Sequence, residues 1–416
     1  MGVEWKKGFN PKLVLDVVAK IARVEPSGAI SYTGMDEIWG RPILVSGLEF
    51  SSDVHHSVQD SLVKTGLIVA IRSGNTTLDG VRQAVSTAQS QYLKKPLNDY
   101  VLATSISIKA PLPFKNLKIQ DCPMAFGRAL PKRFDRSALA ADIANLVPAG
   151  LPLDYAAVRV KCKARLATEA AERALDALAF LRGAWSLCYR WQPHDHLLGI
   201  VRRPVAPFVL GPVHTLHRPD GELASRQFWY EPSYRKPLTC QDLSREWEDL
   251  HKEERWVWRQ ISKACDKDKL VKALIRYANA LSEPQVQDAF LRLWSLLEYL
   301  THAGRAGYDV TVRRAAFLWT DREYALQALN YLRGLRNRAV HSDESSKIAG
   351  TALLHLKAYV DGLIRFLLHP ESITRTIAES AELLDLPCEK QVLNQKIQMY
   401  EWAKGYRYGR ARKRSP

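Results

Sequence analysis

The residues after Leu238 constrain the fold most, because proline becomes scarce there and helical spacing continues almost to the end of the chain. Apolar side chains recur every three or four residues, which is the period of one helix face. Ser282, Thr320-Asp321 and Ser345-Ser346 supply capping residues before several of these segments. Because amphipathic helices with short links form bundles, this half predicts an all-α bundle. Its expected helices are 241–264, 266–281, 284–301, 321–340, 346–368 and 372–384.

The residues before this point have a mixed α/β pattern. Residues 191–237 are rich in proline and glycine, which indicates short strands or a loop-heavy insertion. β-branched alternation or short apolar runs predict strands at 42–50, 66–72, 99–110 and 114–120. Apolar spacing of three to four residues predicts helices at 13–24, 78–94 and 154–190.

The expected fold class is therefore α+β. A mixed α/β region at 1–237 precedes a helical bundle at 238–385, and a C-terminal helix with a basic tail follows at 386–416. A further boundary is expected near residue 150, ahead of the long helix at 154–190. A chain of 416 residues is long enough for two or three domains with full cores.

The composition is that of a globular protein, with 46% hydrophobic residues. No apolar stretch is long enough to span a bilayer, and the N-terminus lacks a signal-peptide core. The six cysteines are widely spaced, as expected of reduced residues in a cytoplasmic protein. We therefore expect no membrane association.

The charge balance points to polyanionic partners. Sixty Lys and Arg against 44 Asp and Glu give a net charge of +16. Nucleic acid is the leading candidate, with an acidic membrane surface and simple solubility as alternatives. The basic tail would contribute weak, non-specific phosphate contacts through Arg407, Arg410, Arg412, Lys413 and Arg414.

The pattern of an arginine followed by a histidine after four to six residues occurs three times. Arg190/His196 spans Pro193, and Arg245/His251 lies among acidic residues typical of a solvated face. Arg336/His341 alone lies in a strong apolar helical period. It places a guanidinium, which holds phosphate, near an imidazole, which transfers protons at neutral pH.

A helical wheel shows where the residues of this third motif would lie on the helix. At about 100° per residue, Arg336 falls near the middle of an apolar sector, while Asn337 and His341 line its edge. An arginine in a core-facing sector has to be paired or has to line a polar cleft, because an unpaired buried charge is very costly. A structural salt bridge to a neighbouring helix is the alternative interpretation. The sector comprises Ala325, Leu326, Leu329, Leu332, Leu335, Ala339 and Val340.

A basic helical bundle whose third main helix ends in Arg-Asn-x-x-x-His resembles the HEPN superfamily. Residues 290–300, Phe-Leu-Arg-Leu-Trp-Ser-Leu-Leu-Glu-Tyr-Leu, look like the second helix of its ApeA-like branch, found in bacterial anti-phage systems. The resemblance covers about residues 255–370. It implies that Arg336 and His341 form a catalytic pair, that Asn337 assists in positioning, and that Glu298 and Arg338 support the site. Glu298 would be able to pair with Arg336.

The resemblance also implies the activity. HEPN ribonucleases cleave RNA through its 2′-OH without metal or cofactor, and two copies dimerise so that both motifs line one cleft. A homodimeric toxin or abortive-infection effector is therefore expected, with residues 1–237 sensing a phage-derived trigger or binding a regulatory partner. A non-catalytic module that holds RNA, a nucleotide or a protein is the alternative.

Other clusters suggest structural roles. His194-Asp195-His196, His214/His217 and His55-His56 would each supply two histidines to a metal, but no further ligands lie near them in sequence. Surface loops are the favoured interpretation, and no metal site is expected. Trp247, Trp256 and Trp258 are expected to be core or interface anchors.

Overall fold

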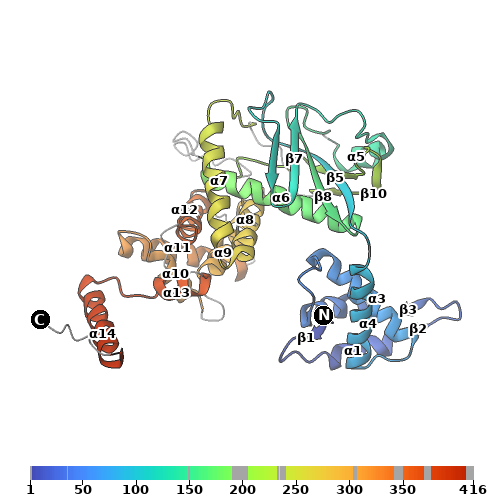
Figure 1. Cartoon of the computed structure of the whole chain (residues 1–416), viewed down its shortest axis with the longest axis horizontal. Helices are drawn as coiled ribbons and strands as arrows, with labels where there is room; N and C mark the ends of the chain where they lie inside the picture. Colours follow the sequence, from blue (N-terminus) through green and yellow to red (C-terminus); the bar gives the residue numbers. More distant parts are fainter. Residues whose placement is uncertain are drawn as a thin grey trace, which may run out of the picture.

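The computed structural model shows a mixed α/β protein with a helical C-terminal region (Figure 1). No helix within the described ranges combines the length and apolar character that a bilayer span requires. For His341 and residues 36–39 only the backbone is described. The structure describes residues 2–34, 36–148, 150–189, 205–231, 234, 240–302, 307–341, 350–369 and 376–408.

The first unit consists of four helices and two small ribbons around its own core, which includes Val3, Leu44 and Val85. Strand β1 pairs with β4, and β2 pairs with β3. The strand predicted at 66–72 is wrong because these residues are the end of a helix, and the one at 42–50 is wrong except at its last residues. The elements are β1 Glu4–Trp5, α1 Lys12–Ile21, β2 Ala22–Val24, β3 Ile30–Tyr32, α2 Asp36–Gly47, β4 Leu48–Glu49, α3 His56–Arg72 and α4 Leu78–Leu93.

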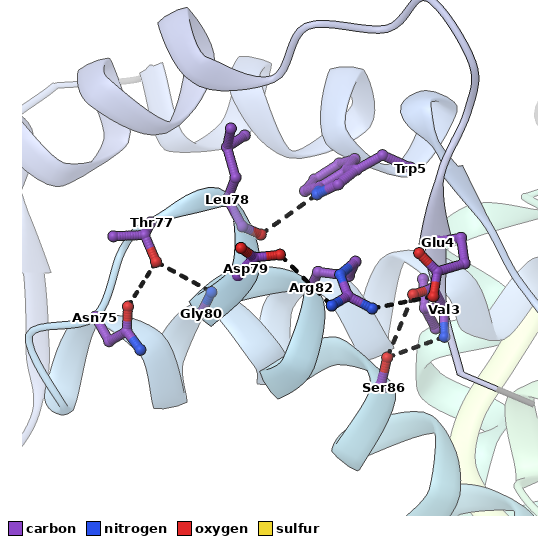
Figure 2. Close-up of polar contacts among 10 residues, drawn as sticks. All are labelled: Val3, Glu4, Trp5, Asn75, Thr77, Leu78, Asp79, Gly80, Arg82 and Ser86. Atoms are coloured by element: carbon purple, nitrogen blue, oxygen red, sulfur yellow. Dashed lines mark hydrogen bonds and ion pairs between the residues drawn. The ribbon is translucent and has the colours of Figure 1, made fainter.

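Helix α4 anchors the start of the chain, as Figure 2 shows. Its N-cap, Thr77, accepts a hydrogen bond from the Gly80 amide at 3.1 Å. Farther along the helix, Ser86 Oγ accepts one from the Val3 amide at 2.9 Å. Arg82 also forms an ion pair with Glu4 at 3.0 Å. These contacts fix β1 over α4 and close the first unit.

A six-stranded antiparallel sheet follows in the order β10-β9-β5-β8-β7-β6. The strands predicted at 99–110 and 114–120 are confirmed as β5 and β6. The helix predicted at 154–190 is wrong in its first part, which is the central strand β8. Buried Val158, Val160 and Cys162 alternate there with charged residues, a period of two. The strands are β5 Asn98–Ile106, β6 Asn116–Ile119, β7 Cys122–Gly127, β8 Ala156–Ala164, β9 Val213–His217 and β10 Leu223–Tyr230; η1 Ser137–Leu139 and α5 Ala140–Leu146 lie between β7 and β8.

Helix α6, Ala167–Cys188, lies between the sheet and the bundle (Figure 1). It contacts β5 and β8 as well as α7 and α8, and is buried almost all round from Ala177 to Cys188. A Cβ at Gly183 would come within 2.3 Å of the Leu274 carbonyl oxygen, so glycine permits the close approach of α6 and α8. The sheet and the bundle therefore share this helix.

The C-terminal region is helical, as predicted, although α10 was not predicted. The expected tryptophan anchors are confirmed: Trp247 stacks on Phe114 at 3.9 Å, and Trp258 meets Phe180 edge-on at 5.4 Å. Helix α14 has no buried residue. The helices are α7 Trp247–Lys263, α8 Lys267–Ser282, α9 Val286–Leu300, α10 Tyr308–Ala316, α11 Arg322–His341, α12 Gly350–Leu367, α13 Ile377–Leu384 and α14 Lys390–Tyr408.

The buried side chains group differently from the expected domains. One continuous core includes residues from Leu102 to Leu384, so it joins the sheet, α6 and the bundle. The first unit has separate clusters that end near Tyr92. Residue 237 thus does not separate two cores, and the division at 237 remains a prediction about function.

Candidate functional site

Helix α11 positions the Arg-Asn-x-x-x-His motif at its end. The helix begins after Asp321, whose carboxylate accepts a hydrogen bond from the Tyr324 amide at 3.0 Å. Its buried side chains Ala325, Leu329, Leu332 and Leu335 pack into the bundle, where α11 contacts α9, α10 and α12. The predicted apolar sector is therefore confirmed along most of its length. The predicted placement of Val340 in that sector is wrong, because its side chain is 49% exposed.

Arg336 lies at the rim of the core. Its side chain is half-buried, and its guanidinium lies 4.5 Å from the centre of the Tyr308 ring. Its Nη1 is 3.5 Å from Asn337 Oδ1, the outer limit of a hydrogen bond. Among the described residues, no carboxylate lies within 4.0 Å of it. The guanidinium thus has an aromatic neighbour and no described counter-ion.

The other motif residues lie on the same last turns. Asn337 is half-buried beside Arg336, and Arg338 is exposed. His341 is the last residue of α11, and its side chain lies outside the described part of the structure. Gln287 of α9 donates a hydrogen bond to the Ala339 carbonyl at 3.2 Å, which ties this end of α11 to α9.

Glu298 does not pair with Arg336. Its carboxylate instead accepts a hydrogen bond from Trp294 Nε1 at 2.7 Å, one turn earlier on α9. An ion pair between Arg333 and Asp309 joins α11 to α10 one turn before Arg336. The possible pairing of Glu298 is therefore wrong, whereas its supporting role remains a prediction.

Helix α10 carries Tyr308 and is firmly anchored. Both Arg314 Nε and Nη2 donate to the Asp385 carboxylate, at 2.9 and 2.6 Å. Arg314 Nη1 also donates to the Thr301 carbonyl at 2.7 Å. The hydrogen bonds from Arg314 hold the pKa of Asp385 below its usual range. These bonds join α10 to the end of α9 and to α13. Sequence reasoning missed Tyr308 because it did not predict α10.

The basic tail is described only in part. Arg407 is exposed on α14, and its phosphate contact stays a prediction. The residues Arg410, Arg412, Lys413 and Arg414 lie outside the described residues.

Two of the three histidine clusters differ from surface loops. His214 and His217 are buried in β9. His214 shares a hydrogen bond with Thr104 Oγ1 at 2.7 Å, and His217 has one with the Gly221 carbonyl at 2.8 Å. The loop interpretation of this pair is therefore wrong. His194-Asp195-His196 lies outside the described residues.

His55 and His56 form the third cluster, at the start of α3. His55 is the N-cap of α3 and faces α6, where Asp176 brings a carboxylate near both rings. One donor atom from each of these three residues lies within 4.8 Å of the others. Burial, followed by the charge of His56, lowers the pKa of His55 to about 4. This group is the donor set suited to a metal in the part of the chain that the structure describes.

His251 also departs from expectation. Rather than lying on a fully solvated face, it pairs through Nδ1 with Glu254 Oε2 at 3.1 Å, and Glu254 is buried. Burial raises the pKa of Glu254. The pair is structural, since α7 packs this side against the core.

A cavity of about 390 Å³ lies elsewhere, around α5. Arg136 lines it together with Ile143, Val147 and Leu151. Burial lowers the pKa of Arg136 to about 10, and its Nη2 donates to the Ala103 carbonyl at 2.7 Å. Its walls contain no residue of α11, so it does not belong to the motif.

No family model, curated protein or solved structure matches the chain. The functional assignment therefore rests on the residues described above. The half-buried Arg336 with Asn337 at the end of α11 is one chemically distinctive arrangement. The histidine and aspartate group between α3 and α6 is the other.

Proposed function

We propose that this protein is a cytoplasmic, metal-independent endoribonuclease of the HEPN type, acting as an anti-phage or toxin effector. The observation that carries the proposal is Arg336, a half-buried guanidinium with no carboxylate in ion-pair distance among the described residues. A charge already paired with a carboxylate would be a poor phosphate ligand. Arg336 retains its donors for a substrate, and α11 brings Asn337 and His341 to the same end.

The reaction would use the nucleophile that RNA itself carries. The imidazole of His341 would accept the proton of the 2′-OH as its oxygen bonds to phosphorus. A second imidazole would protonate the 5′-oxygen as the P–O5′ bond breaks. Arg336 would stabilise the charge developing on the non-bridging oxygens. The products are a 2′,3′-cyclic phosphate and a 5′-OH.

The need for an acid and a base supports a homodimer. The chain has one Arg-Asn-x-x-x-His motif, at residues 336–341. The second His341 would therefore come from another copy of the bundle. The net charge of +16 and the exposed Arg407 favour a polyanionic substrate. Residues 1–237 would restrain the bundle until a phage-derived trigger or regulatory partner binds.

The test compares cleavage of total RNA in EDTA by the unaltered protein and by Arg336→Ala and His341→Ala. Both substitutions should lower the rate by about 100-fold or more, because each removes a group that acts in the transition state. Mass spectrometry of the fragments should show cyclic phosphate ends. If residues 1–237 keep the purified enzyme inactive, growth arrest of phage-infected cells, in which the proposed trigger is present, replaces RNA cutting as the readout.

Arg333→Ala is the matched control. It removes an arginine one turn away that also bridges α11 and α10, through Asp309. Its rate should remain near that of the unaltered protein. Undiminished cutting or arrest by both motif variants would refute the proposal. RNA binding without cutting would instead support the non-catalytic module.

A further inference from the structure

His55, His56 and Asp176 come together from elements that are far apart in sequence. The histidines begin α3, and Asp176 lies in the third turn of α6, where the first unit meets the rest of the protein. His55 Nε2 is 3.8 Å from Asp176 Oδ2, and the three donor atoms are all within 4.8 Å of one another. This juxtaposition is independent of the ribonuclease motif.

The separations suit an ion more than a direct bond. At 3.8 Å, His55 and Asp176 are too far apart for a hydrogen bond. Ligand atoms about 2.0 Å from a tetrahedral zinc ion lie about 3.3 Å from one another. Side-chain adjustments of an ångström or less would therefore bring all three donors to a common ion.

A hydrogen bond also orients His55 as a ligand. Its Nδ1 is 2.7 Å from Ser57 Oγ, on the side of the ring opposite Nε2. Nδ1 also accepts a hydrogen bond from the Ser57 amide at 3.4 Å, so both contacts hold the ring at the start of α3 with Nε2 facing Asp176. Zinc at Nε2 would place the ring proton on Nδ1, where Ser57 Oγ at 2.7 Å is able to accept it, as outer partners of metal-bound histidines do.

The surrounding charges leave the carboxylates without a fixed cation. Glu172 lies one turn before Asp176, and burial raises the pKa of both groups. Among the described residues, neither has a Lys or Arg within 4.0 Å. Arg173, the nearest arginine in sequence, is paired with Glu169 at 2.9 Å. Lys272 of α8 influences Asp176 only at longer range.

We propose that His55, His56 and Asp176 bind one Zn²⁺ ion that clamps the first unit to α6. Two imidazoles and one carboxylate favour zinc over calcium or magnesium, which prefer oxygen ligands. Water or Glu172 would complete the four ligands. The site would be structural or regulatory and has no part in RNA cleavage.

The test is metal binding by the tag-free, EDTA-stripped full-length protein. Titration with Zn²⁺ should show one ion per chain at micromolar concentrations, and Co²⁺ should give a tetrahedral visible spectrum without thiolate bands. His55→Ala and Asp176→Asn should each weaken binding by at least about tenfold, in line with loss of a direct ligand. His251→Gln is the control, because His251 has a carboxylate neighbour at 3.1 Å but belongs to no three-donor group among the described residues.

Protease sensitivity provides a second readout. The segment between α4 and β5 connects the two parts, so Zn²⁺ should slow its cleavage in the unaltered protein but not in Asp176→Asn. Absence of zinc binding, or equal binding by both site variants and the unaltered protein, would overturn the proposal. Since RNA cutting is assayed in EDTA, either proposal can fail while the other stands.

Discussion

At the scale of single residues, the partial exposure of Arg336 explains how the protein accommodates its charge. A fully buried guanidinium would require a carboxylate, but Arg336 is only half-buried and keeps contact with water. The Tyr308 ring at 4.5 Å adds a cation–π attraction of about 0.5–1 kcal/mol. This contact orients the side chain without neutralising it. The position predicted from the helical period is thus approximately right. Of the two predicted alternatives, a paired charge or a place in a polar cleft, no described carboxylate supplies the first.

The burial of His214 leads to a prediction about how the stability of the protein depends on pH. Burial lowers its pKa from 6.5, with Arg182 and Arg136 acting in the same direction and Glu231 opposing them. Below about pH 6.5 the unfolded chain binds a proton at this position and the folded chain does not, so stability falls as the pH drops. One such histidine contributes up to about 1.4 kcal/mol per pH unit. Urea unfolding between about pH 7.5 and 5.5 measures the slope.

His214→Gln supplies the comparison, since an amide is able to keep the hydrogen bond with Thr104 but does not titrate. Its unfolding free energy should depend less on pH over this interval than that of the unaltered protein. Identical slopes would show that His214 titrates normally in the folded state.

At the scale of elements, the contact between α6 and α8 depends on Gly183. Gly183→Ala should lower the unfolding free energy by about 1–3 kcal/mol, because its Cβ would press on the Leu274 backbone. Gly334→Ala in α11 is the matched control. The nearest atom to its Cβ, Arg338 Nη1, is 3.7 Å away, so alanine should stabilise by about 0.5–1 kcal/mol. Denaturant unfolding measures both, and equal effects would contradict this account.

The helices of the bundle were predictable because each has one apolar face and a repeating period. Helix α10 was not predictable from the sequence, because Val310, Thr311 and Val312 are β-branched. The helix is held in place by the ion pair between Arg314 and Asp385, which are far apart in sequence. The apolar runs within α2 and α3 were too short to distinguish buried helix from strand. Sequence spacing found Arg336 and Asn337 because they are neighbours on one helix. It did not find Tyr308 or Asp176, which other elements bring to their sites.

At the scale of the whole molecule, the grouping of cores predicts which pieces fold. A protein of residues 98–408 keeps the continuous core from Leu102 to Leu384 and should unfold cooperatively. A protein of residues 238–408 loses α6 and exposes Ala273, Leu274 and Leu281 of α8, so it should show no sharp transition. Thermal unfolding followed by near-UV circular dichroism measures both. A sharp transition in the shorter piece would mean that the bundle is an independent domain.

The burial of α6 has a mechanical consequence. Its 22 residues form a rod about 33 Å long, with Asp176 at the joint to the first unit and Gly183 wedged against α8 about 10 Å further on. From Ala177 to Cys188 the rod is packed almost all round, and this part does not bend without opening voids, so it moves as one piece. A displacement at Asp176, one residue before this packed part, would therefore be passed along the helix to its contact with α8.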